Sequence, residues 1–270
     1  MLRGTGYHPE NEEKKPQEVK FYEDLPKCRA YVGEEGQMAA FSYETIDFGH
    51  ELAEEIEQRV TRLGADGKLL PGDDGTPYHV TMLEKLLIPA LVKVTNFVPG
   101  GGVWLNTQRP EWNDANNALV GSGLSVVTAC YLRRYCEFLI RWLSRGELPK
   151  SIMVSREINS LVSNIARTLE SNSELFSGDL SDAQRKKIVD ALSQAGSDYR
   201  QQLYASGLSG ETVELPLGDC VSLLKQCLQM IDHTILVNRR SDGLYHSYNL
   251  MGMHSDGYAV TTLQEMLEGQ

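Results

Sequence analysis

A segment between Pro99 and Gly123, PGGGVWLNTQRPEWNDANNALVGSG, combines carboxylates, amides, glycines and tryptophan without a helical apolar period. Trp112 offers a flat apolar face that can stack on the C–H surface of a sugar ring. Asp114 and Glu111 can donate or accept a proton. A carboxyl beside an indole in a partly dry pocket keeps its proton, because desolvation disfavours the charged form. These residue types therefore favour Asp114 as a general acid, with Glu111 as a supporting carboxylate.

Polar side chains around this carboxylate have the donors and acceptors that recognise hydroxyl groups. Arg109, Asn113 and Asn117 are the candidates for hydrogen bonds to a substrate, and Trp104 is a further candidate for substrate binding. The three glycines Gly100 to Gly102 allow positive φ and a close approach of the backbone. Together these residues predict a sugar subsite in a loop of the chain.

A purely structural interpretation of the same loop competes with catalysis. Loops rich in Asp and Asn are commonly turns and helix N-caps. Asn116 or Asn117 would then cap a helix that begins near Leu119. Composition alone favours this interpretation over a catalytic one.

The segment GGGVWLNTQRPEWNDANNALVG resembles a loop of the cellobiose and chitobiose phosphorylase family and of its (α/α)6-barrel relatives. That loop reads Gly-Asp-Trp-Asn-Asp-Gly-Met-Asn, followed closely by Gly. Residues 112–114 match the Trp-Asn-Asp core, residues 116–117 stand near the family's Asn, and Gly121 stands near the following Gly. Glu111 replaces the first Asp, and Ala115 replaces the Gly after the second. The resemblance implies that Asp114 protonates the glycosidic oxygen and that Trp112 contacts the sugar.

Two classes of function follow from these residues. The first is a carbohydrate-active enzyme that cleaves glycosidic bonds with inversion, by hydrolysis or phosphorolysis. Its substrate would be an oligosaccharide or glycoside, and no cofactor or metal is expected apart from inorganic phosphate as a co-substrate of phosphorolysis. The alternative is a non-catalytic helical scaffold or saccharide-binding subunit that pairs with another chain.

Composition limits the other classes. The 270 residues carry a net charge of −11, without the basic run that nucleic-acid binding requires. No segment approaches the ~20 apolar residues of a membrane span. The N-terminus lacks a signal or transit peptide. The five cysteines are an odd number and match no metal-ligand or disulfide spacing, which indicates reduced thiols that are buried as small apolar residues. We therefore expect a cytoplasmic protein with no nucleic-acid or membrane partner.

Hydrophobic periodicity predicts a mainly α fold with long functional loops. Expected helices cover about 52–63, 80–97 with a bend at Pro89, 124–143, 153–170, 181–204 and 217–238. The helix over 124–143 is apolar on most of its circumference, so we expect it to be buried on several sides. Ser181 with Gln184 predicts a capping box, Asp219 an N-cap, and Gly64 a C-terminal glycine.

Few segments predict strands. GLYHSYNLMGMHSDGYAV is the best candidate for a short hairpin, and VTTLQEMLEGQ at the end predicts a helix. His246 and His254 match no zinc pattern, so a polar loop is the preferred interpretation. Tyr245, His246 and Tyr248 could also line the mouth of a sugar site.

The resemblance implies hairpins of an (α/α) toroid, a partial (α/α)6 barrel. Residues 1–40 would be an irregular N-terminal segment, and 41–270 a helical domain. The number of helices expected here is about half of the number in a barrel of six hairpins. The chain would therefore be part of a larger catalytic domain or pair with a partner chain. The second catalytic group would then lie outside it.

Overall fold

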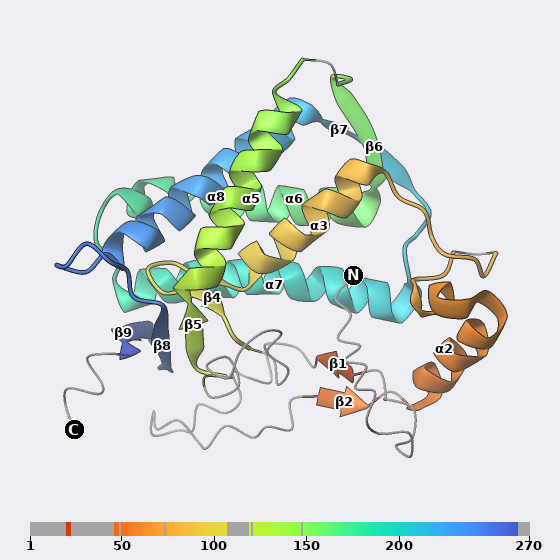
Figure 1. The fold of residues 1–270 in the computed structure, drawn as a ribbon, viewed down its shortest axis with the longest axis horizontal. Coiled ribbons are helices and arrows are strands. Elements are labelled where there is room, and N and C mark those ends of the chain that lie inside the picture. The colour runs from red at the N-terminus through yellow and green to blue at the C-terminus, as the bar shows by residue number, and fades with distance from the viewer. Residues whose placement is uncertain are drawn as a thin grey trace.

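The computed structural model describes residues 20–22, 46–48, 50–72, 74–106, 119, 121–146 and 148–263. Over these ranges the chain is mainly helical, as the sequence predicts (Figure 1). The α-helices are α2 (His50–Leu63), α3 (Met82–Thr95), α5 (Val126–Leu143), α6 (Arg156–Glu170), α7 (Asp182–Ser206) and α8 (Leu217–Val237). The 3-10 helices are η1 (Gly64–Lys68) and η2 (Ser173–Ser177).

Local signals at the helix ends are confirmed in two cases. Ser181 and Gln184 form the predicted capping box at the start of α7. Gly64, which follows α2, has a φ of +61°, the left-handed conformation that favours glycine. The prediction for Asp219 is wrong: α8 begins at Leu217, directly after Pro216, and Asp219 lies inside its first turn. The N-cap position is occupied by Pro216, the last residue of the preceding strand, whose side chain has no oxygen that could accept a backbone N–H.

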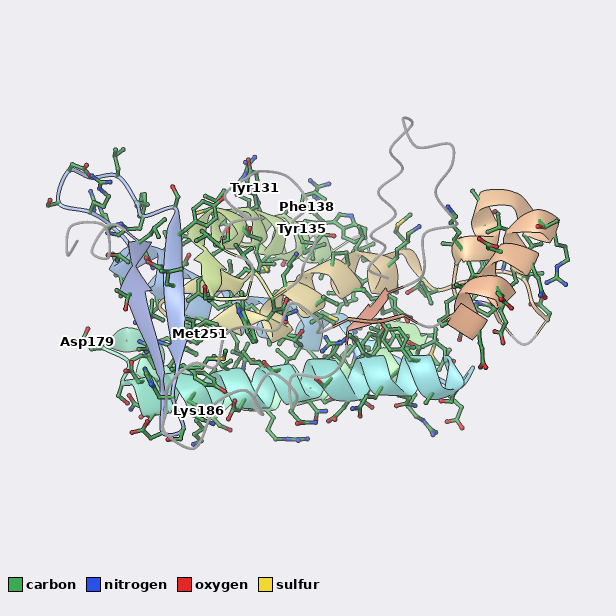
Figure 2. The ribbon with its side chains drawn as sticks, turned by 90° about the horizontal axis from the view of Figure 1, so that it is seen from below. Tyr131, Tyr135, Phe138, Asp179, Lys186 and Met251 are labelled. Carbon is green, nitrogen blue, oxygen red and sulfur yellow. The ribbon has the colours of Figure 1, made fainter. Side chains whose placement is uncertain are left out.

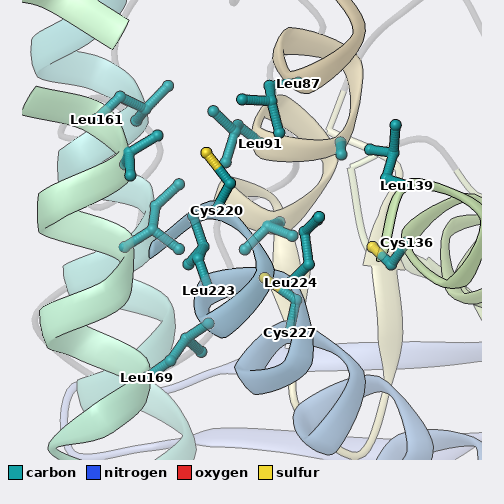
Figure 3. Close-up of a cluster of buried hydrophobic side chains, with 14 of the residues drawn as sticks. Leu87, Leu91, Cys136, Leu139, Leu161, Leu169, Cys220, Leu223, Leu224 and Cys227 are labelled. Atoms are coloured by element: carbon teal, nitrogen blue, oxygen red, sulfur yellow. The ribbon is translucent and has the colours of Figure 1, made fainter. Parts of the chain in front are cut away.

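Leucines and cysteines from five helices form the main core. α8 packs against α5 and α6, and α3 packs against α5, α6 and α7. Figure 3 shows this interior, where Cys136, Cys220 and Cys227 lie among leucines. The prediction of buried free thiols is confirmed for these three cysteines, whereas Cys130 is only half-buried and Cys28 lies outside the described residues.

One face of α5 differs from the prediction. Tyr131 is 57% exposed and Phe138 is 50% exposed, although the sequence suggested that α5 is buried on several sides. The buried side of α5 is formed by Leu132, Cys136 and Leu139, which face α8 and α3. An apolar period shows which residues can be buried, but the number of neighbouring helices decides how many are.

An antiparallel sheet closes one end of the helical layer (Figure 1). Its strands run in the order β3 (Phe97–Val98), β4 (Gly102–Trp104), β5 (Gly123–Ser125), β8 (Tyr248–Met253) and β9 (Tyr258–Thr262). The predicted hairpin is confirmed as β8–β9. The predicted C-terminal helix is wrong over Val260–Thr262, because these residues pair with β8.

A second antiparallel ribbon lies at the opposite end of the bundle (Figure 1). β6 (Ser151–Ser155) leads directly into α6, and β7 (Thr212–Pro216) leads directly into α8. Two further short strands, β1 (Lys20–Tyr22) and β2 (Ile46–Phe48), pair before α2. No helix in the described ranges combines the length and apolar character needed to cross a membrane.

Candidate functional site

The loop that carries the candidate acid leaves the sheet between β4 and β5. Leu105 donates its N–H to the carbonyl of Gly123 at 2.8 Å, and Gly121 donates to the carbonyl of Leu105 at 2.8 Å. Gly123 donates to the carbonyl of Leu119 at 2.6 Å. These bonds hold both ends of the loop against each other at the N-terminal end of α5.

The capping interpretation of Asn116 and Asn117 is wrong about where the helix begins. α5 starts at Val126, not near Leu119, and its N-cap is Ser125, whose hydroxyl accepts the N–H of Thr128 at 3.0 Å. The residues before it are occupied by β5, which pairs with both β4 and β8. Asn116 and Asn117 themselves lie outside the described residues.

Trp104 is the predicted substrate residue that the structure describes. Its side chain is 4% exposed, and its indole N–H donates to the carbonyl of Gly121 at 2.8 Å. Trp104 therefore joins the two sides of the loop base. The other predicted site residues lie outside the described residues: Arg109, Glu111, Trp112, Asn113, Asp114 and Asn117.

The glycines of the opening segment form the turn between β3 and β4, and we call Pro99–Gly102 the glycine turn. A Cβ on Gly101 would lie 2.3 Å from Cδ1 of Leu124. A Cβ on Gly102, whose φ is +125°, would lie 2.7 Å from the backbone of Ser125. The close approach that these glycines permit is thus to the adjacent strand β5.

Arg185 of α7 holds the glycine turn from one side. It is 8% exposed, and its Nε donates to the carbonyl of Pro99 at 2.9 Å. Its other nitrogens donate to the carbonyls of Tyr258 and Leu180 and to the carboxylate of Asp182. A single guanidinium therefore connects α7, the glycine turn and β9.

Polar side chains from α8 and β8 hold the turn from the other side. Asn238 donates to the carbonyl of Gly100 at 2.9 Å, and Asn249 donates to the carbonyl of Gly101 at 2.8 Å. The N–H of Gly100 donates to the hydroxyl of Thr234 at 2.9 Å. Because these backbone groups are already hydrogen-bonded within the protein, the turn supports the loop base and does not present its backbone to a ligand.

The sequence carried no signal for this support. Its side chains lie between 86 and 148 positions away from the turn along the chain. Isolated Arg, Thr and Asn residues in predicted helices and strands are ordinarily surface residues. Only the packing of α7, α8 and β8 around β3 and β4 brings them together.

Replacing Arg185 with Met tests the role of this guanidinium. The variant leaves the buried carbonyls of Pro99 and Tyr258 and the half-buried carbonyl of Leu180 short of a donor. We therefore expect the free energy of unfolding to fall by about 2–4 kcal/mol. Chemical denaturation monitored by circular dichroism gives the value. The control is Lys187→Met, a substitution of an exposed residue two positions further along α7. It should change the free energy of unfolding by about 0.5 kcal/mol or less. An equal effect of both variants would contradict the support role.

A second set of titratable groups lies beside the loop base, on α7 and β9. Asp190 accepts from Nζ of Lys186 at 2.6 Å and from the hydroxyl of Tyr258 at 2.9 Å. The ammonium of Lys186 also lies 5.2 Å from the centre of the Tyr258 ring. Figure 2 shows Lys186 on α7 below Met251 of β8. The carboxylate of Asp190 is paired on both oxygens, which makes it a link between α7 and β9.

The buried thiols are poor nucleophiles. Burial raises the pKa of the Cys136 thiol to about 12 and that of Cys220 to about 11, and it also raises the pKa of Cys227. A thiol with such a pKa stays protonated at neutral pH, and the thiolate is the reactive form. Cys136, Cys220 and Cys227 therefore act as apolar residues of the hydrophobic core.

The histidine-containing hairpin lies at the same end as the loop base. β8 pairs with β5 through Tyr248 opposite Ser125, and the N–H of His246 donates to the carbonyl of Asn238 at 3.0 Å. Across the described part of the chain, no group of three or more His, Cys, Asp or Glu is arranged to hold a metal ion. The suggestion that Tyr245, His246 and Tyr248 line a sugar site stays a prediction.

Comparison with known proteins gives no family. No family model matches this chain, and none of the curated proteins matches it in sequence.

Proposed function

We propose that this chain is a carbohydrate-active protein that cleaves glycosidic bonds with inversion, by hydrolysis or phosphorolysis. Asp114 is the general acid, and Glu111 supports it. Trp112, with Asn113, Asn117 and Arg109, forms the sugar subsite. Trp104 contributes from the loop base.

The observation that carries the proposal is the Trp-Asn-Asp sequence at 112–114, set in a loop whose ends are held by β4 and β5. A catalytic group needs a rigid support to stay in a productive position. The bonds of Trp104, Arg185, Asn238 and Asn249 supply such a support. The N-cap of α5 is Ser125, so the N-cap of this helix comes from β5 and not from the loop.

The fold that we propose is a set of hairpins of an (α/α) toroid. The consecutive helices α6 and α7 pack on each other, which supports a hairpin at this place in the chain. In this proposal the partner carboxylate or the phosphate-binding groups come from another part of a larger catalytic domain or from a partner chain.

The stereochemistry of the product tests the proposal. Purified protein is incubated with β-linked disaccharides such as cellobiose and chitobiose, with and without inorganic phosphate, and the anomeric protons are followed by NMR in the first minutes. We expect the α-anomer of the sugar or of its 1-phosphate, because attack from the opposite face inverts the anomeric carbon. The phosphate dependence identifies the nucleophile.

Two results would contradict the enzymatic proposal. Formation of the β-anomer would mean retention, which requires a different pair of carboxylates. Saccharide binding without turnover, measured by calorimetry on the same panel, would favour the second candidate, a saccharide-binding subunit that pairs with another chain. The exposed aromatic residues of α5 are the observation that favours this candidate.

A further inference from the structure

The outer edge of β6 presents backbone groups to its surroundings. At the two ends of the β6–β7 ribbon, the N–H of Arg156 donates to the carbonyl of Glu211 and the N–H of Leu217 donates to the carbonyl of Lys150, both at 2.9 Å. Opposite residues of an antiparallel pair alternate between those that exchange hydrogen bonds and those whose backbone groups point away. Counted from these two bonds, the residues of β6 that point away from β7 are Ser151, Met153 and Ser155.

Part of this outer edge is free. The carboxylate of Glu84, on α3, accepts the N–H of Ser155 at 3.0 Å and so closes one end of the edge. In the part of the chain that the structure describes, no hydrogen bond joins the outward backbone groups of Ser151 or Met153 to another group. An open strand edge of this kind is a template for pairing with another chain.

The side chains of β6 do not protect its edge. The five residues of this strand, SIMVS, carry no charge. Val154 is buried on the side of the ribbon that packs on α6 and α8, whereas Met153, on the opposite face, is 48% exposed. Natural edge strands are usually protected by charged residues or by proline, and β6 has neither.

The outer edge of β7 is protected in this way. Glu214 is one of its outward residues, and the strand ends at Pro216, which has no N–H to donate. In a two-fold pair of β7 edges centred on Val213, the two copies of Glu214 would be diagonal neighbours on one face, and like charges there are destabilising. The ribbon therefore has one protected edge and one open edge, and the open edge belongs to β6.

We propose that β6 pairs with β6 of a second copy of this chain, antiparallel and around a two-fold axis at Ile152. This register places Ser151 opposite Met153 of the other copy. Each free N–H and each free carbonyl of these two residues then meets its complement across the axis.

The neighbouring positions are compatible with the same register. Pro149, which has no N–H, lies opposite Ser155 of the other copy, whose N–H is already bound by Glu84. Lys150 lies opposite Val154 of the other copy, so like charges do not face each other. The register therefore leaves no backbone donor of β6 without an acceptor.

Pairing also covers the exposed side chain of Met153. Its two copies become diagonal neighbours on the outer face of the joined sheet, within reach of each other. The ribbon lies at the end of the bundle opposite the loop base (Figure 1), so the dimer does not cover the loop base and is independent of the proposed function. Since the paired edge is short, the dimer should be weak and depend on concentration.

Removal of one backbone donor tests the pairing. Met153→Pro takes away an N–H that points away from β7, so the hydrogen bonds within the ribbon remain. The mass of the full chain is measured by sedimentation velocity and light scattering over a range of concentrations. We expect the wild-type mass to rise from 30.2 kDa towards twice that value. The Met153→Pro variant should have a dimer dissociation constant raised at least about tenfold.

The matched control is Thr212→Pro, which removes an outward N–H from the opposite edge of the same ribbon. It should leave the dimer dissociation constant unchanged. Circular dichroism of both variants shows whether loss of the dimer is separate from loss of the fold.

Charge exchange at Met153 tests the two-fold axis without proline. Met153→Lys and Met153→Glu should each weaken the dimer, because like charges then lie beside each other across the axis. An equal mixture of the two variants should dimerise again, because opposite charges then meet. These two variants decide the question alone if Met153→Pro does not fold.

The proposal fails if the wild-type chain is a monomer at every concentration. It also fails if the Met153→Pro dimer is as tight as that of the wild type, since another surface then holds the copies together. An equal loss in Thr212→Pro would contradict the choice of the β6 edge. A mixture of the lysine and glutamate variants that stays monomeric would overturn the two-fold pairing at Ile152.

Discussion

Asp114→Asn should lower the turnover of a disaccharide substrate by about 10²–10⁴-fold, the usual contribution of general acid catalysis. The amide keeps the shape of the side chain but cannot deliver a proton to the leaving oxygen. The measurement is the initial rate of sugar or sugar-phosphate release. Asp256→Asn, in the exposed turn between β8 and β9, is the matched control and should leave the rate unchanged.

A second substrate separates the loss of an acid from the loss of a binding site. In an aryl glycoside with an acidic phenol, the leaving group departs as a phenolate and needs no proton from the enzyme. We therefore expect the Asp114→Asn variant to retain most of the wild-type activity on that substrate. An equal loss on both substrates would show that residue 114 serves binding or loop structure. Full activity on the disaccharide would remove Asp114 from the mechanism.

Gly102→Ala should lower the free energy of unfolding by about 3–5 kcal/mol. The φ of +125° is strained for any residue with a Cβ, and the new Cβ would lie 2.7 Å from the backbone carbonyl group of Ser125. Strand β5 cannot move away, because it also pairs with β8. Thermal and chemical unfolding of the purified variant give the change.

Gly146→Ala is the control for this variant. Gly146 also has a positive φ, +73°, but a Cβ there would meet no atom within 4 Å. We expect Gly146→Ala to lower the free energy of unfolding by about 1–2 kcal/mol, because only the backbone strain of a positive φ is added. The difference between the two variants measures the contact between the glycine turn and β5. Equal losses would show that this contact is unimportant for stability.

The long helices could be predicted closely from the sequence. The apolar period over 124–143 and over 217–238 is sustained for several turns, and each turn adds evidence for the same helix. The Ser181–Gln184 capping box could be predicted as well, because its hydrogen bonds join residues only three positions apart. Such features depend on local interactions.

The short strands around the loop could not be predicted in this way. β3, β4 and β5 have two or three residues each, too few to show a period of two, and two of them contain glycine. β5 forms because β4 and β8 lie on either side of it, and β8 comes more than 120 positions later in the chain. The helix predicted near Leu119 was wrong because this pairing replaces the local preference.

The sequence by itself determined the mainly helical class, the helix spans and the residue types of the candidate loop, because these depend on neighbouring residues. The tertiary structure decided the role of the glycines and of Trp104, which hold the loop base. It also brought Arg185, Asn238 and Asn249 to the glycine turn and left Tyr131 and Phe138 of α5 exposed. Each of these depends on contacts between residues far apart in the chain, which only the packing of the helices against the sheet can create.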